Sequence, residues 1–322
     1  MKILGSFFRL QISVFVAAIL IFSCKKENSG RLTEAEERQA SFISSDADAE
    51  ATIVFNGLFD DVMGANLTKI EGLQTGSTGI FGLSSIGNTS IGGNTGRSDS
   101  LPSCASVTVF HLNGTGFPIK IITEFSASGC LCNDGHVRKG RLIFIFTDRL
   151  SVPGAIATTT FDNFWVDSIH VEGTHKITNT SASTTTAQIY KVDIDAKLSK
   201  PNGNYSEWHN HYVLTQTDGI TYPIQFAFQT YGFKIFPGSA FGKVKRNDVL
   251  VAWRAEVIEP LVKRYNCRWI SKGIVRITRD NLANNSLWVG HLDYSFPNSP
   301  IGGCDNRAKL TVNGNVHEIT LR

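Results

Sequence analysis

Two acidic residues at strand spacing are the first candidates for chemistry. Asp193 and Asp195 lie in an alternating stretch, so both side chains project from one face of the expected strand. A pair of carboxyl groups is what a glycoside hydrolase uses as acid and as base or nucleophile. Lys191 and Lys197 flank the aspartates on the same face. Neutralisation of charge between neighbouring strands is therefore the simpler interpretation.

Two histidines follow at the same spacing. His209 and His211 also share one face of an expected strand, which is how a strand offers two metal ligands. No third ligand can be identified from the spacing, and two histidines alone do not define a metal site. A solvated polar face is the expectation, with metal binding as the alternative. No cofactor is expected.

Aromatic side chains supply the third candidate site. Trp165, Trp208 and Trp253 fall in expected strands, where exposed rings could form a platform that stacks on sugars. Aromatic residues in strands are also frequent core or cross-strand partners, so burial is the competing interpretation. The short motifs of serine hydrolases, zinc metalloproteases, phosphate-binding loops and EF-hands are absent from the sequence. Their absence favours a protein without catalysis and leaves open an enzyme that lacks short motifs.

The N-terminal stretch predicts export. Two basic residues, Lys2 and Arg9, precede a mostly apolar run over residues 10–22. This order is typical of a secretory signal, and the run is too short for a spanning helix. The segment Ile21-Phe22-Ser23-Cys24 resembles the lipobox of bacterial lipoproteins, which implies removal of residues 1–23 and lipid attachment at Cys24. An ordinary signal peptide with an incidental cysteine is the alternative.

The cysteine count fits an exported chain. If Cys24 carries lipid, five cysteines remain: Cys104, Cys130, Cys132, Cys267 and Cys304. Disulfides are the default in an oxidising compartment, and an odd count leaves one thiol over or one link between molecules. A C-x-C-x3-H pattern that ends at His136 offers zinc as a sharper alternative, although a second cluster of ligands is missing.

The length and the net charge of the chain limit the class of partner that it can bind. The chain has 322 residues with 31 Lys+Arg and 28 Asp+Glu, a net charge of +3. Removal of Lys2 and Arg9 with the signal leaves 29 against 28, or +1. A chain so close to neutral lacks the concentrated basic surface that nucleic acid requires, so no nucleic-acid partner is expected.

The remaining chain divides by composition into four parts. Residues 24–45 are mostly polar and small, as in a tether, although Thr33 and Glu36 could cap one or two helical turns. Residues 46–66 predict one short amphipathic helix, which most simply covers its own domain. Residues 67–100 are rich in Gly and Ser, as in a linker. Residues 101–322 predict an all-β domain. The apolar positions of the helix are Ala51, Phe55, Leu58 and Val62.

Period-two alternation marks about a dozen long antiparallel strands, which form either an extended twisted sheet or a sandwich. Turn dipeptides between them are Asn113-Gly114, Asp134-Gly135, Asn202-Gly203, Asp218-Gly219 and Asn313-Gly314. The last hairpin can be predicted in register. A two-residue turn at Asn313-Gly314 pairs Val312 with Asn315, Leu310 with His317 and Ala308 with Ile319. That register puts apolar residues on one face and charges on the other.

A weak internal repeat relates the two ends of the β domain. In each half a cysteine leads through apolar strands to an acid-aromatic-serine stretch, then to glycine-cysteine and a basic strand. Two halves built alike would close two similar disulfides. The predicted links are Cys104 to Cys130 or Cys132, and Cys267 to Cys304.

Several segments together resemble a group of uncharacterised lipoproteins of Bacteroidota. They are Cys130 to Gly135, Arg138-Lys139-Gly140, Thr158 to Phe164, Val171 to Thr174, Cys267-Arg268-Trp269, Cys304-Asp305-Asn306 and Ile319-Thr320-Leu321. The resemblance covers residues 104–322 and the signal, and it implies a compartment without a mechanism. In such bacteria, charged residues after the lipidated cysteine can direct export to the cell surface, and Lys25-Lys26-Glu27 is similar to such a signal.

The sequence therefore predicts a lipid-anchored protein of the cell envelope, attached to the outer membrane, with exposure at the cell surface as one of two alternatives beside the periplasmic side. Its expected role is a binding or structural module without catalysis, whose partner is a glycan or an envelope protein. The alternative function is a surface glycan hydrolase that uses carboxylates on the sheet face.

Overall fold

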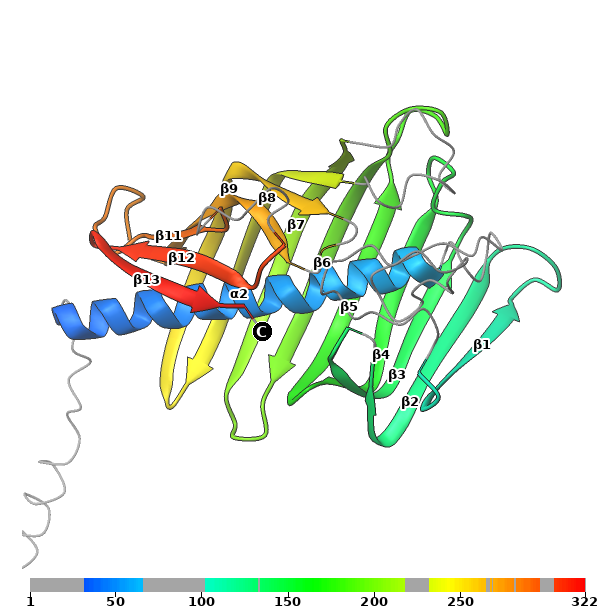
Figure 1. Ribbon diagram of the computed structural model, residues 1–322, viewed down its shortest axis with the longest axis horizontal. Coiled ribbons are helices and arrows are strands. Elements are labelled where there is room, and N and C mark those ends of the chain that lie inside the picture. Colours follow the sequence, from blue (N-terminus) through cyan, green and yellow to red (C-terminus); the bar gives the residue numbers. More distant parts are fainter. Residues whose placement is uncertain are drawn as a thin grey trace, which may run out of the picture. The chain divides into compact units, whose positions relative to one another are not determined.

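The computed structural model describes residues 32–65, 102–132, 134–217, 232–264, 267, 269–280, 282–295 and 304–321. These residues form the helix α2 (Glu34–Ala65) and thirteen strands (Figure 1). The strands are β1 (Ala105–His111), β2 (Ile119–Leu131), β3 (Val137–Phe146), β4 (Ile156–Val166), β5 (Ile169–Asn179), β6 (Ile189–Ser199), β7 (Tyr205–Gln216), β8 (Gly232–Arg246), β9 (Val249–Arg264), β10 (Ile270–Arg279), β11 (Gly290–Asp293), β12 (Arg307–Val312) and β13 (Asn315–Thr320). By their contacts, residues 37–322 make one compact unit, and residues 1–36 a second.

The strands form a single antiparallel sheet in which each strand lies beside its neighbours in the sequence. The all-β prediction is confirmed, and of its two forms the extended sheet is the one observed. Where the connection is short, as between β12 and β13, it imposes this order, because a tight turn can join only adjacent antiparallel strands. Turns predicted at Asn113-Gly114, Asp134-Gly135 and Asn202-Gly203 fall between strands, with positive φ at each glycine. The turn predicted at Asp218-Gly219 lies outside the described residues.

The pairing register carries one row of side chains across the whole outer face. The row runs Phe110, Lys120, Ile145, Thr158, Lys176, Asp193, His211, Ser239, Glu256, Arg276, His291, Thr311 and Val316, one residue from each strand. The neighbouring row, one residue further along the strands, points to the inner face. It contains Ile121, Phe144, His175 and Ile194, which are all buried. Because alternate residues point to opposite faces, the sheet separates a polar outer face from an apolar inner face.

The last hairpin has the predicted register. Val312 pairs with Asn315, Leu310 with His317 and Ala308 with Ile319. Ala308, Leu310 and Val312 are buried, whereas Arg307 and Glu318 form an exposed ion pair. Asn313 and Gly314 both have positive φ, as a two-residue turn of this kind requires.

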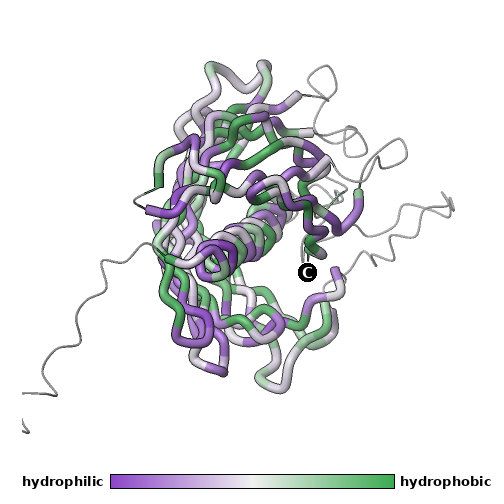
Figure 2. The backbone as a smooth tube through the Cα atoms, turned by 90° about the vertical axis from the view of Figure 1, so that its left-hand side faces the viewer, coloured by the Kyte–Doolittle hydropathy of each residue, from purple (hydrophilic) through white to green (hydrophobic). Residues whose placement is uncertain are grey.

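The inner face of the sheet is covered by α2, which lies within its curve (Figure 2). The four predicted apolar positions of the helix are buried, so the expectation that it covers its own domain is confirmed. Phe55 stacks on Trp208 with ring centroids 5.4 Å apart, and Phe59 meets Phe233 edge-on at 5.6 Å. Such contacts supply the packing without which an isolated helix is marginal.

The helix is longer than predicted, since it begins at Glu34 and not at residue 46. Residues 34–45 are therefore helical, and the expected tether over 24–45 is wrong for that part. The capping box is present: the Thr33 backbone N–H donates to Glu36, and the Glu36 N–H donates to the Thr33 hydroxyl. Ser44 and Ser45 donate to backbone carbonyls within the helix. Serines satisfied in this way act as small residues that permit close packing.

Acidic side chains on α2 dock it against the sheet. The helix holds eight of the chain's 28 acidic residues and one of its 31 basic residues. Their ionic partners within residues 37–322 include Arg279 for Glu37, Arg246 for Asp46, Arg246 and Lys200 for Glu50, Lys263 for Asp60, and Arg138 for Asp61. The position of the helix along the sheet is thus fixed by specific ionic contacts as well as by apolar packing.

Candidate functional site

The candidate aspartates and histidines come together on the outer face of the sheet. In the register of β6 and β7, Asp193 lies opposite His211 and Asp195 lies opposite His209. The Nδ1 atom of His211 is 2.7 Å from Asp193 Oδ1, and Nδ1 of His209 is 3.3 Å from Asp195 Oδ1. The sequence predicted that each pair shares a face, but only the register shows that the two pairs meet.

A shallow trough of about 340 Å³ lies over these pairs on β5 to β8. Phe241 of β8 forms one wall, with 58% of its side chain exposed and its ring stacked on His209 at a centroid distance of 4.7 Å. Lys176 lies opposite Asp193 on β5. Thr174, Asn210 and Ser239 add to the polar lining. The trough therefore offers one exposed aromatic ring beside carboxylate, imidazole, ammonium and hydroxyl groups.

The arrangement does not favour hydrolysis. A carboxyl that acts as a general acid needs surroundings that disfavour its charged form, but Asp193 and Asp195 are 41% and 75% exposed and each contacts a histidine. Ser239 lies beside His211 on β8, which gives the order carboxylate, imidazole, hydroxyl across three strands. These groups are on an open face, where water weakens the electrostatic effects that catalysis uses.

The described residues of the trough bring no third metal ligand to the two histidines. His209 and His211 each contact their own aspartate. Among the residues that the structure describes, no group of three or more His, Cys, Asp or Glu side chains is placed to hold a metal ion. The described residues thus offer no third ligand to a metal ion bound by His209 and His211.

The predicted tryptophan platform is not formed. Trp208 and Trp253 are each only 1% exposed and belong to the core between α2 and the sheet. Their positions in β7 and β9 point inward, because the apolar alternation of these strands faces the helix. Trp165 is half-buried, contacts the His170 ring in a tilted arrangement and donates its indole N–H to Asn163. The exposed aromatic residue beside the polar cluster is Phe241, which the sequence did not single out.

Trp208 instead serves to hold a buried acid. Its indole N–H donates to Asp48 Oδ1 of α2 over 3.0 Å. Burial raises the pKa of Asp48 to about 6, and the Trp208 hydrogen bond opposes that rise. A cavity of about 40 Å³ beside Asp48 is lined by Thr52 and Asn56 from the helix and by Tyr212 from β7. This volume suits two or three water molecules, so it is too small for an organic ligand.

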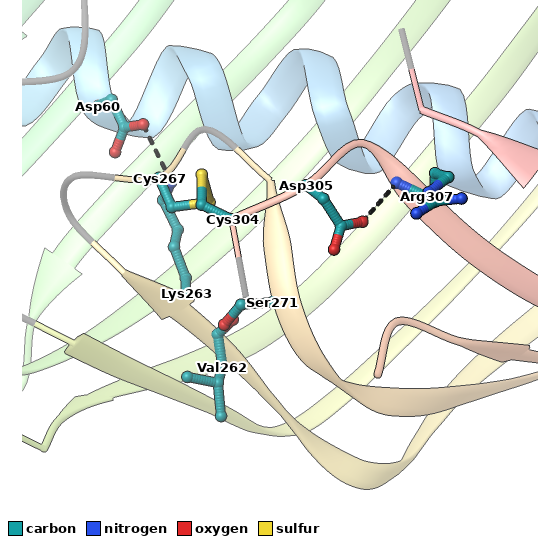
Figure 3. The surroundings of a disulfide bond; sticks show 8 residues. All are labelled: Asp60, Val262, Lys263, Cys267, Ser271, Cys304, Asp305 and Arg307. Atoms are coloured by element: carbon teal, nitrogen blue, oxygen red, sulfur yellow. Dashed lines mark hydrogen bonds and ion pairs between the residues drawn. A yellow bond between two sulfur atoms is a disulfide. The ribbon is translucent and has the colours of Figure 1, made fainter. Parts of the chain in front are cut away.

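The cysteines form two disulfides, Cys104–Cys130 and Cys267–Cys304, and the second lies near the Asp60–Lys263 pair (Figure 3). Both predicted links are confirmed, with Cys130 rather than Cys132 as the partner of Cys104. Cys132 is a buried free thiol whose pKa is raised by burial.

The zinc alternative over this stretch is wrong. Cys130 is bonded to another sulfur, and the Nδ1 atom of His136 lies 2.7 Å from Asp167. Only Cys132 of the three expected ligands is left without such a bond, and a structural zinc site requires four ligands.

The proposed lipid site at Cys24 and the signal before it lie outside the described residues. Within the residues that are described, no helix has the length and apolar character needed to cross a membrane. The chain matches no family model, no curated protein and no solved structure.

Proposed function

We propose that this chain is a lipid-anchored envelope protein of a bacterium, attached to the outer membrane and exposed at the surface, that binds carbohydrate in the trough over β5 to β8. It acts as a binding module without catalysis. The observation that carries the proposal is the exposed Phe241 ring beside two exposed carboxylates. The anchor rests on the lipobox-like segment at Cys24 and on the resemblance to Bacteroidota lipoproteins.

The chemistry of the trough suits a sugar. A pyranose presents an apolar face of C–H groups and a rim of hydroxyls, so it needs an aromatic ring and several hydrogen-bond partners. Phe241 supplies the ring, and His209 beneath it fixes the ring's orientation through the stacked contact. Asp193 and Asp195 accept hydrogen bonds from hydroxyls, whereas Lys176 donates them.

The same features favour binding over hydrolysis. The trough is shallow and lies on an exposed sheet face, where a glycan can lie across several strands without being enclosed. Lys191 lies 3.6 Å from Asp193, and Lys176 faces it from β5. With these cations and His211 around it, Asp193 is placed to form hydrogen bonds and ionic contacts on an open surface, which suits binding.

The test is direct binding of the full chain to a panel of neutral and uronate-containing oligosaccharides, followed by calorimetric titration of the strongest binder. Phe241→Ala should weaken that binding at least tenfold, because the stacking surface is lost. Phe236→Ala is the matched control, since Phe236 is a 48% exposed phenylalanine of the same strand that does not line the trough. The Phe236→Ala variant should bind the oligosaccharide with the affinity of the wild type.

Asp195→Asn is a second variant for the same titration. It keeps the size of the side chain but replaces a charged carboxylate, the stronger acceptor of hydrogen bonds from sugar hydroxyls, with a neutral amide. We expect a loss of about five- to tenfold, corresponding to about 1 to 1.4 kcal/mol. The proposal fails if no sugar in the panel binds at millimolar concentration, or if the Phe241 and Phe236 variants lose affinity equally.

A further inference from the structure

The two edges of the sheet differ in their chemistry. β1 forms one edge and β13 forms the other. β1 reads ASVTVFH, with no Lys, Arg, Asp, Glu or Pro. Proteins usually protect an edge strand with charges or proline, because its free backbone groups can pair with another chain. β13 has such protection, since Glu318 forms an ion pair with Arg307 beside it.

The apolar side chains of β1 are incompletely covered. Val109 is 38% exposed although it lies in the inner row with Ile121 and Phe144, which are fully buried. Phe110, on the outer face of the same strand, is 46% exposed. Among the described residues, the apolar core therefore continues to the β1 edge and ends there half-covered.

The sequence of β1 is compatible with pairing to a copy of itself. An antiparallel pairing with two-fold symmetry centred on Thr108 places Thr108 opposite Thr108 of the second copy. Val107 then faces Val109 of the second copy on the inner side, and Ser106 faces Phe110 on the outer side. The central inner-face contacts, Val107 with Val109, are apolar, and Ala105 faces His111 at the two ends. The central pair is threonine with threonine, and no like charges meet.

We propose that the protein forms a two-fold dimer through antiparallel pairing of the two β1 strands. The pairing joins the two sheets into one and covers Val109 of each copy with Val107 of the other. An isologous contact of this kind closes on itself, so it limits the assembly to two copies. The dimer would also present two carbohydrate troughs on one particle, although the pairing itself does not depend on the proposed function.

The register gives a sharp test by cross-linking. In the proposed pairing, the two Cα atoms at position 108 lie about 4.5 to 5.5 Å apart, within the range that a disulfide spans. Thr108→Cys should therefore give a covalent dimer under mild oxidation, seen on a gel without reductant. Ser106→Cys is the control, because its two copies lie four residues apart along the strand, about 13 Å, and should not cross-link.

A second arm measures mass in solution by light scattering over a hundredfold range of concentration. The wild-type chain should have twice the mass of one chain at the upper concentrations, and Val109→Lys should have the mass of one chain. Val316→Lys, a matched change on the opposite edge where Val316 is 59% exposed, should remain a dimer.

Three results would overturn the proposal. One is a wild-type chain that has the mass of one copy throughout. Another is equal cross-linking at positions 106 and 108. The third is protection of the β1 amides from hydrogen exchange that does not change with chain concentration, because another segment of the same chain would then cover the edge.

Discussion

Asp60 of α2 and Lys263 of β9 form an ion pair of 2.9 Å in which each side chain is only 1% exposed (Figure 3). Both charges have left water, so each depends on the other for compensation. Asp61, the next residue on the helix, contacts Arg138 of β3, which also holds Asp134 through two hydrogen bonds. Buried charges thus tie one end of the helix to strands far apart in the sheet.

Removal of one partner of the buried pair should be costly. Lys263→Met leaves Asp60 with a buried charge that has lost its ammonium, and we expect a loss of about 3 to 5 kcal/mol in the free energy of unfolding. Urea denaturation followed by tryptophan fluorescence measures it. The double variant Asp60→Leu with Lys263→Met should recover most of the loss, because no charge then remains buried. Equal losses in the single and double variants would contradict this account.

The buried acid of the helix predicts a dependence of stability on pH. The pKa of Asp48 is about 6 in the folded chain and 3.8 in the reference state, with burial as the main cause. Because the folded state binds the proton more tightly, stability due to Asp48 is present at low pH and is lost as the pH rises from about 4 to 6. Asp48→Asn removes this effect, so its stability relative to wild type should rise by about 2 kcal/mol between pH 4 and pH 7.

The quantity to measure is the difference in the free energy of unfolding between the wild type and Asp48→Asn, because His175 changes the stability of both with the opposite dependence on pH. Burial lowers its pKa to about 3, so His175 favours folding as the pH rises toward 6.5. This contribution is common to both proteins and cancels in the difference. Glu50→Gln is a control on the same helix, since Glu50 is only partly buried and contacts Arg246 and Lys200. A difference curve for Asp48→Asn that stays flat from pH 4 to 7 would refute the prediction.

The two disulfides should contribute strongly to stability. The Cys267–Cys304 link closes a loop with a sequence separation of 37, which corresponds to about 4 kcal/mol in the chain-entropy model. The double change of both residues to Ser should lower the free energy of unfolding by about that amount. Cys132→Ser serves as the comparison and should leave both links intact, as peptide mapping without reduction would show. A native map with Cys132 in a disulfide would be inconsistent with the structure.

Local sequence patterns predicted the elements that depend on local rules. The register of the last hairpin follows from its Asn313-Gly314 turn and the alternation of β12, because a slip of one residue would expose Leu310. The apolar stripe of α2 follows from a period near 3.6 and identified Phe55 as a core residue. The same reasoning missed the first turns of α2, where serines replace apolar residues and only the nearby sheet shows that they are buried.

The candidate site was predicted only in pieces. The alternation placed Asp193 and Asp195 on one face and His209 and His211 on another strand's face, but spacing along one strand says nothing about its neighbour's register. The tryptophan platform was wrong because alternation alone does not say which face of a strand meets the helix. Phe241 was overlooked for the same reason.

The sequence by itself determined the class of fold, the positions of most turns, the pairing of the cysteines to within one alternative and the register of one hairpin. These properties depend on side-chain alternation, on backbone conformations that glycine and asparagine permit, and on short stretches of chain. The tertiary structure decided which face of the sheet α2 covers, and so buried Trp208 while Phe241 stayed exposed. It also brought Asp193 to His211, because contacts between strands depend on the register of the whole sheet.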